Sequence, residues 1–156
     1  MPHPKIVLVG PTASGKSTLV ASISGILIGT RTTCPFEWNI CRSDTDTWSA
    51  EVSVGYHFRT LFDSKRLLVH GATSLTEDGP CSTPVQLLRL LGRAQIIAFS
   101  PFQDPVAILS MDDEAVSRNY SEILLSSLPS KGVIYVDLMV PGFTSRGITI
   151  VDLPGK

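Results

Sequence analysis

The residues with the clearest chemical potential lie near the start of the chain, directly after the apolar run at residues 6–9. Residues 10–17 read Gly-Pro-Thr-Ala-Ser-Gly-Lys-Ser and fit the phosphate-binding pattern G-x-x-x-x-G-K-[ST]. A glycine-containing turn between a strand and a helix leaves backbone N–H groups unpaired around one concavity, where the helix dipole adds positive character. The pattern therefore predicts a loop that binds the phosphates of a nucleotide.

Individual positions of this loop predict particular contacts. Lys16 is expected to reach the outer phosphates as a point charge, and Ser17 to give its hydroxyl to Mg²⁺. The other nucleotide contacts in this stretch are expected at Gly10, Thr12, Ala13, Ser14, Gly15 and Thr18.

A second chemical group stands at the end of an apolar run near the other end of the sequence. Residues 148–151 predict a strand that delivers Asp152 at its carboxyl end and continues into Leu153-Pro154-Gly155. Asp-x-Pro-Gly alone is typical of a turn. In a phosphate-loop protein, however, such a carboxylate can hold Mg²⁺ through a water, opposite Ser17. Gly155 lets a backbone N–H approach a terminal phosphate without a side chain in the way, so the two groups together predict a GTPase site.

The first elements that must position these residues follow from periodicity and capping. After the strand at 6–9, a helix is expected over 17–24, with Leu19, Val20 and Ile23 inward, ending at Gly25. Alternating stretches at 36–41 and 48–56 predict two strands that pair with each other, and residues 57–83 read as a surface excursion.

The second half of the sequence predicts two helices and then two strands. A helix starts at Pro84 behind Ser82 or Thr83 and runs to about Phe99. Core packing explains its one largely apolar face, which holds Leu87, Leu88, Leu91, Ala94 and Gln95. Ser110-x-x-Asp113 reads as the cap of another helix that ends near residue 124. Strands at 133–140 and 147–152 flank Pro141-Gly142, and this short connection favours an antiparallel pair.

Composition limits the class of protein. The 156 residues, 43% of them hydrophobic, favour one domain. A formal charge of −1 and a pI near 6.3 provide no broad basic field, so no nucleic acid partner is expected. Three cysteines without metal-ligand spacing indicate reduced thiols and a cytoplasmic setting. The first apolar run is too short for a signal peptide or a membrane span.

Several of these stretches together resemble the dynamin-type GTPases, most closely the dynamin-like proteins of fungi. The similarity covers nearly the whole chain, and Thr32 lies much farther from Asp152 than the two switches of small Ras-like GTPases lie from each other. It rests on residues 10–18, Ile23-Ser24-Gly25, Thr32 with Cys34-Pro35 and Glu37, residues 48–54, Arg93-Ala94-Gln95 and residues 151–155.

The resemblance implies an α/β P-loop NTPase fold over residues 1–156, a dynamin-type G domain that is truncated after the second switch. It implies Mg²⁺ as cofactor and GTP as ligand, with hydrolysis to GDP and phosphate. Thr32 would be the catalytic first-switch threonine and, with Ser17 and Asp152, a Mg²⁺ ligand. The resemblance also implies that copies of the chain can associate with one another, and that membrane contact occurs only through regions beyond this chain. The segments are the first strand and phosphate loop 5–18, the first switch 26–37, the excursion 57–83 and the second switch 152–156.

The sequence also departs from the pattern of the family. Thr12 and Ala13 stand where dynamins usually carry a glutamine and a serine, Thr33 replaces a usual arginine, and Pro11 cannot donate a backbone N–H. The chain carries no N/T-K-x-D segment to select guanine. Slow or absent turnover is therefore expected.

Two other interpretations stay open at this point. The loop is also similar to the start of tRNA dimethylallyltransferases, which use ATP, although the acidic, serine-containing segment of those enzymes does not follow Gly25. The other alternative is a non-enzymatic remnant of a dynamin-like chain that binds nucleotide weakly or not at all.

Overall fold

The fold is of the α/β type and is built on one mixed β-sheet. A computed structural model describes residues 3–11, 14–25, 33–56, 71–126, 130 and 132–154. The fold agrees with the α/β class that the sequence predicted. The elements in chain order are β1(Lys5–Leu8), α1(Lys16–Ser24), β2(Phe36–Arg42), β3(Ser49–Tyr56), β4(Gly71–Ser74), α2(Pro84–Phe99), α3(Pro105–Leu109), α4(Asp113–Leu125), β5(Gly132–Val140) and β6(Gly147–Asp152).

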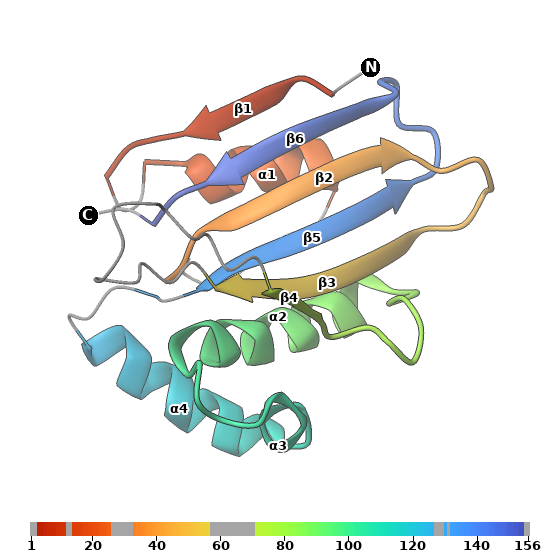
Figure 1. The fold of residues 1–156 in the computed structure, drawn as a ribbon. Coiled ribbons are helices and arrows are strands. Elements are labelled where there is room, and N and C mark those ends of the chain that lie inside the picture. The colour runs from red at the N-terminus through yellow and green to blue at the C-terminus, as the bar shows by residue number, and fades with distance from the viewer. Residues whose placement is uncertain are drawn as a thin grey trace, which may run out of the picture.

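The six strands lie in the order β1-β6-β2-β5-β3-β4 (Figure 1). The pairs β1–β6 and β2–β5 are parallel, and the other pairs are antiparallel. Asp152 at the end of β6 is in register with Leu8 of β1 on one side and with Phe36 of β2 on the other. The carboxyl ends of β1 and β6 and the amino end of β2 therefore meet at one edge of the sheet.

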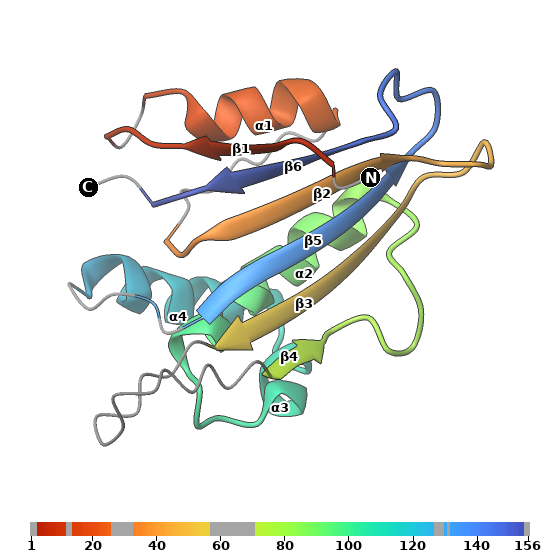
Figure 2. The same ribbon diagram turned by 45° about the horizontal axis from the view of Figure 1, so that its top comes forward.

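All four described helices cover the same face of the sheet (Figures 1 and 2). The sequence explains which face, because apolar side chains alternate with polar ones along the strands. In β2, Phe36, Trp38 and Ile40 are buried, whereas Glu37 and Asn39 between them are only half-buried. Helices α3 and α4 contact α2 and form a further layer behind it.

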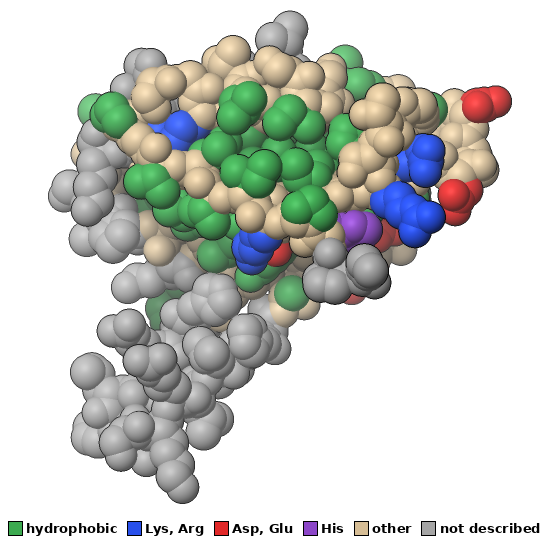
Figure 3. All heavy atoms as spheres, turned by 90° about the horizontal axis from the view of Figure 1, so that it is seen from above, with side chains coloured by type: hydrophobic (Ala, Val, Ile, Leu, Met, Phe, Trp, Pro, Cys, Tyr) green, Lys and Arg blue, Asp and Glu red, His purple; other side chains and the backbone are tan. Residues whose placement is uncertain are grey.

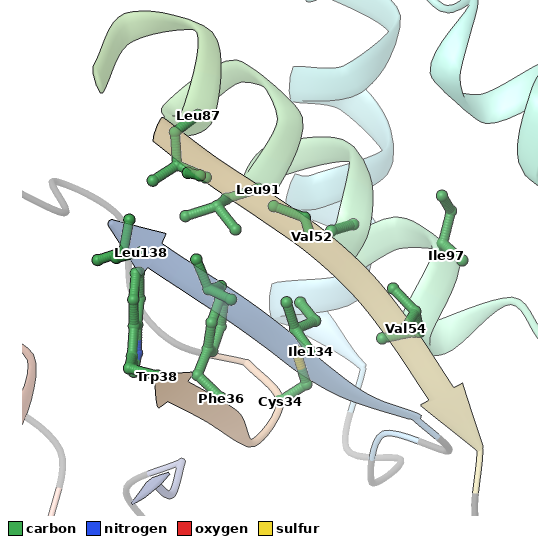
Figure 4. Packing of buried hydrophobic residues seen from close by; sticks show 14 of the residues in the cluster. Cys34, Phe36, Trp38, Val52, Val54, Leu87, Leu91, Ile97, Ile134 and Leu138 are labelled. Carbon is green, nitrogen blue, oxygen red and sulfur yellow. The ribbon is translucent and has the colours of Figure 1, made fainter. Parts of the chain in front are cut away.

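The core lies between this face and helices α1 and α2. Leu87 and Leu91 of α2 point toward the strands, where the rings of Phe36 and Trp38 stack with centroids 5.6 Å apart (Figure 4). Val20 of α1 belongs to the same buried cluster. One continuous core therefore holds the helix that follows the phosphate-binding loop against the sheet.

Residues close in the sequence fix the end of α1 and the start of α2, as predicted. Gly25 ends α1 with φ at 74°, a left-handed conformation that glycine adopts without strain. At the start of α2, the hydroxyl of Thr83 accepts from the Gln86 amide and Pro84 takes the first position.

The predicted start of the next helix was wrong. Ser110 ends the short helix α3, and the side chain of Asp112 caps α4 by accepting a hydrogen bond of 2.7 Å from the Ala115 amide. Both residues are good caps by type. Asp112 takes this role because α3 occupies the residues before Ser110 and fixes the direction in which the chain leaves.

Two predicted strand pairings were also wrong. Strands β5 and β6 do not form a hairpin, because β2 lies between them. Residues 141–146 are long enough to connect the two strands across β2, a total distance of about 10 Å. Strand β3 pairs with β5 and β4 rather than with β2. Alternation fixes the face of a strand and leaves its neighbours open.

Three further details complete the comparison with the sequence. Residues 71–74 of the predicted surface excursion form β4, and residues 57–70 lie outside the described part of the chain. Leu19, predicted to face inward, is 46% exposed. No helix in the described ranges has the length and apolar character needed to cross a membrane.

Candidate functional site

The predicted phosphate-binding loop lies between the end of β1 and the start of α1. Gly15, directly before α1, has φ at 87°, a backbone conformation that side chains other than glycine rarely adopt. A Cβ atom on Gly10 would lie 2.9 Å from the hydroxyl oxygen of Ser14, so a side chain there would require the Ser14 side chain to move. No side chain caps α1. Gly15 thus has a backbone reason to be glycine, and the first turn of α1 has no side-chain cap.

The side chain of Lys16 folds back onto this loop. Its ammonium donates to the carbonyl oxygens of Gly10 at 2.7 Å and Pro11 at 2.8 Å, and lies 3.3 Å from the Ser14 hydroxyl. These three acceptors are neutral oxygens, and hydrogen bonds from an ammonium to an anionic oxygen are stronger. A phosphate in the loop would therefore compete effectively for Lys16.

Ser17 and Asp152 contact each other at the start of α1. The Ser17 hydroxyl donates to Oδ2 of Asp152 at 2.9 Å. Lys16 and Ser17 reach different partners because successive residues of a helix point about 100° apart. The pair joins the first turn of α1 to the carboxyl end of β6, which is the arrangement that the sequence predicted.

Asp152 is in an unusual electrostatic state for an aspartate. Its side chain is fully buried, and Oδ1 has no hydrogen-bond partner among the described residues. Burial raises the pKa of the Asp152 carboxyl, and the Ser17 hydrogen bond and the Lys16 charge offset only part of that effect. A buried carboxylate oxygen without a partner is costly, and a cation or a cation-bound water would supply the missing interaction.

The remaining predicted site residues fall into two groups. Thr18 lies in the first turn of α1 with an exposed side chain, and its carbonyl accepts from the hydroxyl of Ser22. The residues that lie outside the described part of the chain are Thr12, Ala13, Thr32 and Gly155.

One polar contact near the site was not expected from the sequence. Gln95 of α2 is 1% exposed, and its Oε1 accepts from the amide of Thr33 at 3.3 Å and from its hydroxyl at 2.6 Å. The sequence assigned Gln95 to an apolar core face. The polar amide of Gln95 on a face predicted to be buried was the signal that could have indicated a hydrogen-bond partner, because buried polar groups need partners.

The donor set of the site suits a hard cation that keeps part of its water shell. Within the described residues, no group of three or more His, Cys, Asp and Glu side chains could hold a metal ion. The hydroxyl of Ser17 and the carboxylate of Asp152 are oxygen donors, the type that Mg²⁺ prefers, and Mg²⁺ in nucleotide sites takes its other ligands from phosphates and water.

Comparisons with known proteins add no family to this picture. No model of a known protein family matches the chain, and no curated protein matches its sequence. The resemblance to dynamin-type GTPases stays a prediction from the residues quoted above.

Proposed function

We propose that this chain is a Mg²⁺-dependent GTP-binding domain of the P-loop NTPase type, similar to the G domain of dynamin-like GTPases. The observation that carries the proposal is the Ser17–Asp152 pair at 2.9 Å, with one carboxylate oxygen buried and unpartnered. Ser17 is itself the last residue of the stretch whose glycines and lysine fit the phosphate-binding pattern.

Nucleotide binding would use the loop and the pair in different ways. Lys16 would leave the carbonyls of Gly10 and Pro11 for the outer phosphates, and the amides at the start of α1 would bind the same anion. Ser17 would turn its hydroxyl lone pair to Mg²⁺, and Asp152 would accept from a water on that ion. When bound there, Mg²⁺ would neutralise part of the phosphate charge.

Hydrolysis of GTP to GDP and phosphate is the reaction that this proposal implies. Such chemistry consists of positioning and electrostatic stabilisation of an in-line attack by water. By resemblance, Thr32 would orient that water and Gly155 would approach the terminal phosphate. Thr12 and Ala13 lack the polar groups usual at their positions, so binding is the main activity proposed and turnover is slow.

A Mg²⁺ titration tests the proposal. We expect a fluorescent GTP analogue to bind more tightly with Mg²⁺ than with EDTA, and Ser17→Ala to remove most of that difference, about tenfold. Ser22→Ala is the matched control, because Ser22 lies in the same helix and its hydroxyl bonds only to the Thr18 carbonyl in the described contacts. An equal Mg²⁺ effect in unaltered, Ser17→Ala and Ser22→Ala proteins would contradict the proposed site.

Paired titrations with GTP and ATP separate this proposal from the ATP-using alternative. A preference for GTP supports the GTPase interpretation, and a preference for ATP supports a transferase-like protein. Binding of neither nucleotide supports the non-enzymatic remnant.

A further inference from the structure

Gln95 makes a contact that core packing alone does not explain. It lies on the buried face of α2 between Ala94 and Ile96, and its side-chain oxygen accepts two hydrogen bonds from Thr33. A buried glutamine without partners is destabilising, whereas one with good partners fixes a specific geometry. The bond from the hydroxyl is short, at 2.6 Å, so the contact holds Thr33 closely against α2.

The position of Thr33 links this contact to the candidate site. Thr33 comes shortly before Phe36, which is in register with Asp152 at the sheet edge described above. Cys34 between them is fully buried and fixes the same stretch from the core side. The chain held by Gln95 therefore enters β2 three residues before the position beside Asp152, and β2 lies on the opposite side of β6 from β1 and the loop that follows it.

The part of α2 that carries Gln95 is itself firmly attached. Two residues earlier, the guanidinium of Arg93 donates to the Met111 carbonyl at 2.6 Å and to Asp113 at 3.1 Å. Two residues later, the carbonyl of Ile97 accepts from the Tyr56 hydroxyl at 2.5 Å. These contacts tie α2 to the start of α4 and to β3, so the acceptor that Gln95 presents to Thr33 has a fixed position.

We propose that Gln95 is a positioning residue of the nucleotide site and sets the preference for a nucleoside triphosphate over a diphosphate. This inference rests on the proposed function. The loop at Lys16 follows β1 and the chain at Thr33 precedes β2, and these two strands flank the end of β6 that carries Asp152. In this proposal the loop holds both phosphates of a diphosphate. The third phosphate of a triphosphate also contacts the chain that Gln95 holds in place through Thr33. A small displacement of Thr33 therefore weakens triphosphate binding selectively.

The test compares Gln95→Met with Gln86→Met. Methionine has a similar length and lacks the strong acceptor. Gln86 is a matched control, because its Oε1 also accepts from the amide and the hydroxyl of one residue, Ser82, at 2.9 and 3.2 Å, but at the exposed start of α2. The readout is the ratio of the dissociation constants for GDP and for a non-hydrolysable GTP analogue, with Mg²⁺ present.

We expect Gln95→Met to lower this ratio by roughly three- to tenfold, the effect of one lost hydrogen bond, and Gln86→Met to leave it unchanged. Thr33→Val, which removes the shorter bond, is expected to lower the ratio in the same direction, and Thr33→Ser, which keeps the hydroxyl, to preserve it. Combining Gln95→Met with Thr33→Val is expected to add little, because both changes remove the same contact.

The outcomes separate this inference from the proposed function. An unchanged ratio in Gln95→Met, or equal weakening of both nucleotides, would overturn the positioning role and leave nucleotide binding intact. If Gln95→Met does not fold, Thr33→Val and Thr33→Ser decide in the same way. An unaltered chain that binds neither nucleotide would overturn the proposed function and this inference together.

Discussion

The hydroxyl of Ser17 donates to the carboxylate of Asp152 at 2.9 Å, although 135 positions separate the two residues in the chain. Their contact joins the helix that follows the phosphate-binding loop to the end of β6. It leaves the second oxygen of a buried carboxylate without a described partner. We interpret this as an arrangement that sacrifices stability in the ligand-free protein for a prepared cation site.

Asp152→Asn is expected to stabilise the ligand-free protein at neutral pH. Burial raises the pKa of Asp152 in the folded chain, so the folded state binds a proton more readily than the unfolded state. The free energy of unfolding should then fall as pH rises from the ordinary aspartate range through the raised pKa. Asparagine removes this dependence and should add about 1 kcal/mol at neutral pH.

Urea denaturation between about pH 4 and pH 8 measures this effect. Asp137→Asn is the control, because Asp137 is exposed and accepts from the side-chain amide of Asn39. A free energy of unfolding that is lower in Asp152→Asn than in the unaltered chain at neutral pH would contradict the electrostatic argument.

Lys16→Ala is expected to weaken nucleotide binding by about 30- to 1000-fold, because a charge-assisted contact to the phosphates is lost. Titration with a fluorescent GTP analogue measures the change. Lys5→Ala removes the same charge from the exposed ion pair with Glu37 at 3.2 Å and should leave affinity nearly unaltered. Equal affinities for the two variants would remove the phosphate-loop assignment.

Turnover in the unaltered chain is expected to be close to background even where binding is firm. Thr12 and Ala13 replace two polar groups of the kind that act on the transition state, and each such group is commonly worth about 100-fold in rate. Phosphate release at saturating GTP measures this, beside the double change Thr12→Gln and Ala13→Ser. Faster release from the double variant is the expected result, and robust release from the unaltered chain would refute the expectation.

The β1 edge of the sheet is expected to promote self-association. Hydrophobic side chains gather on this side of the molecule (Figure 3). Val7 of β1 is 53% exposed, and Val9, directly after the strand, is 79% exposed. Within the described residues β1 pairs with β6 alone, through contacts such as the Thr149 amide to the Pro4 carbonyl. Alternate backbone groups of β1 therefore point outward, which invites another strand.

Val7→Lys should raise the monomer fraction in sedimentation velocity experiments, because a charge on an edge strand opposes pairing. Val85→Lys is the matched control, since Val85 is 67% exposed at the start of α2. Hydrogen exchange at the Val7 amide, which points away from β6, gives a second readout and should slow as the protein concentration rises. A concentration-independent monomer in the unaltered chain would contradict this prediction.

Local sequence determined much of the secondary structure. Gly25 ends α1 because a left-handed residue follows the last helical turn, and Pro84 begins α2 because its fixed backbone suits the first position. The alternation around Trp38 defined β2 and the face that it buries. These features depend on residues close in the chain, so the sequence alone could predict them.

The sequence also brought Lys16, Ser17 and Asp152 together as a hypothesis, because their residue types and the elements before them fit one pattern of phosphate chemistry. It could not supply the contact between Gln95 and Thr33. That contact depends on which side of the sheet α2 covers and on how the chain enters β2.

Only the tertiary structure decided the order of the strands. The turn at Pro141-Gly142 favoured a hairpin of β5 and β6, yet β2 lies between them, and β5 separates β2 from β3. A period of two assigns each side chain to a face and says nothing about which strand lies alongside. The neighbours follow from long-range packing of all apolar faces against α1 and α2, and this same packing buries Asp152 beside Ser17.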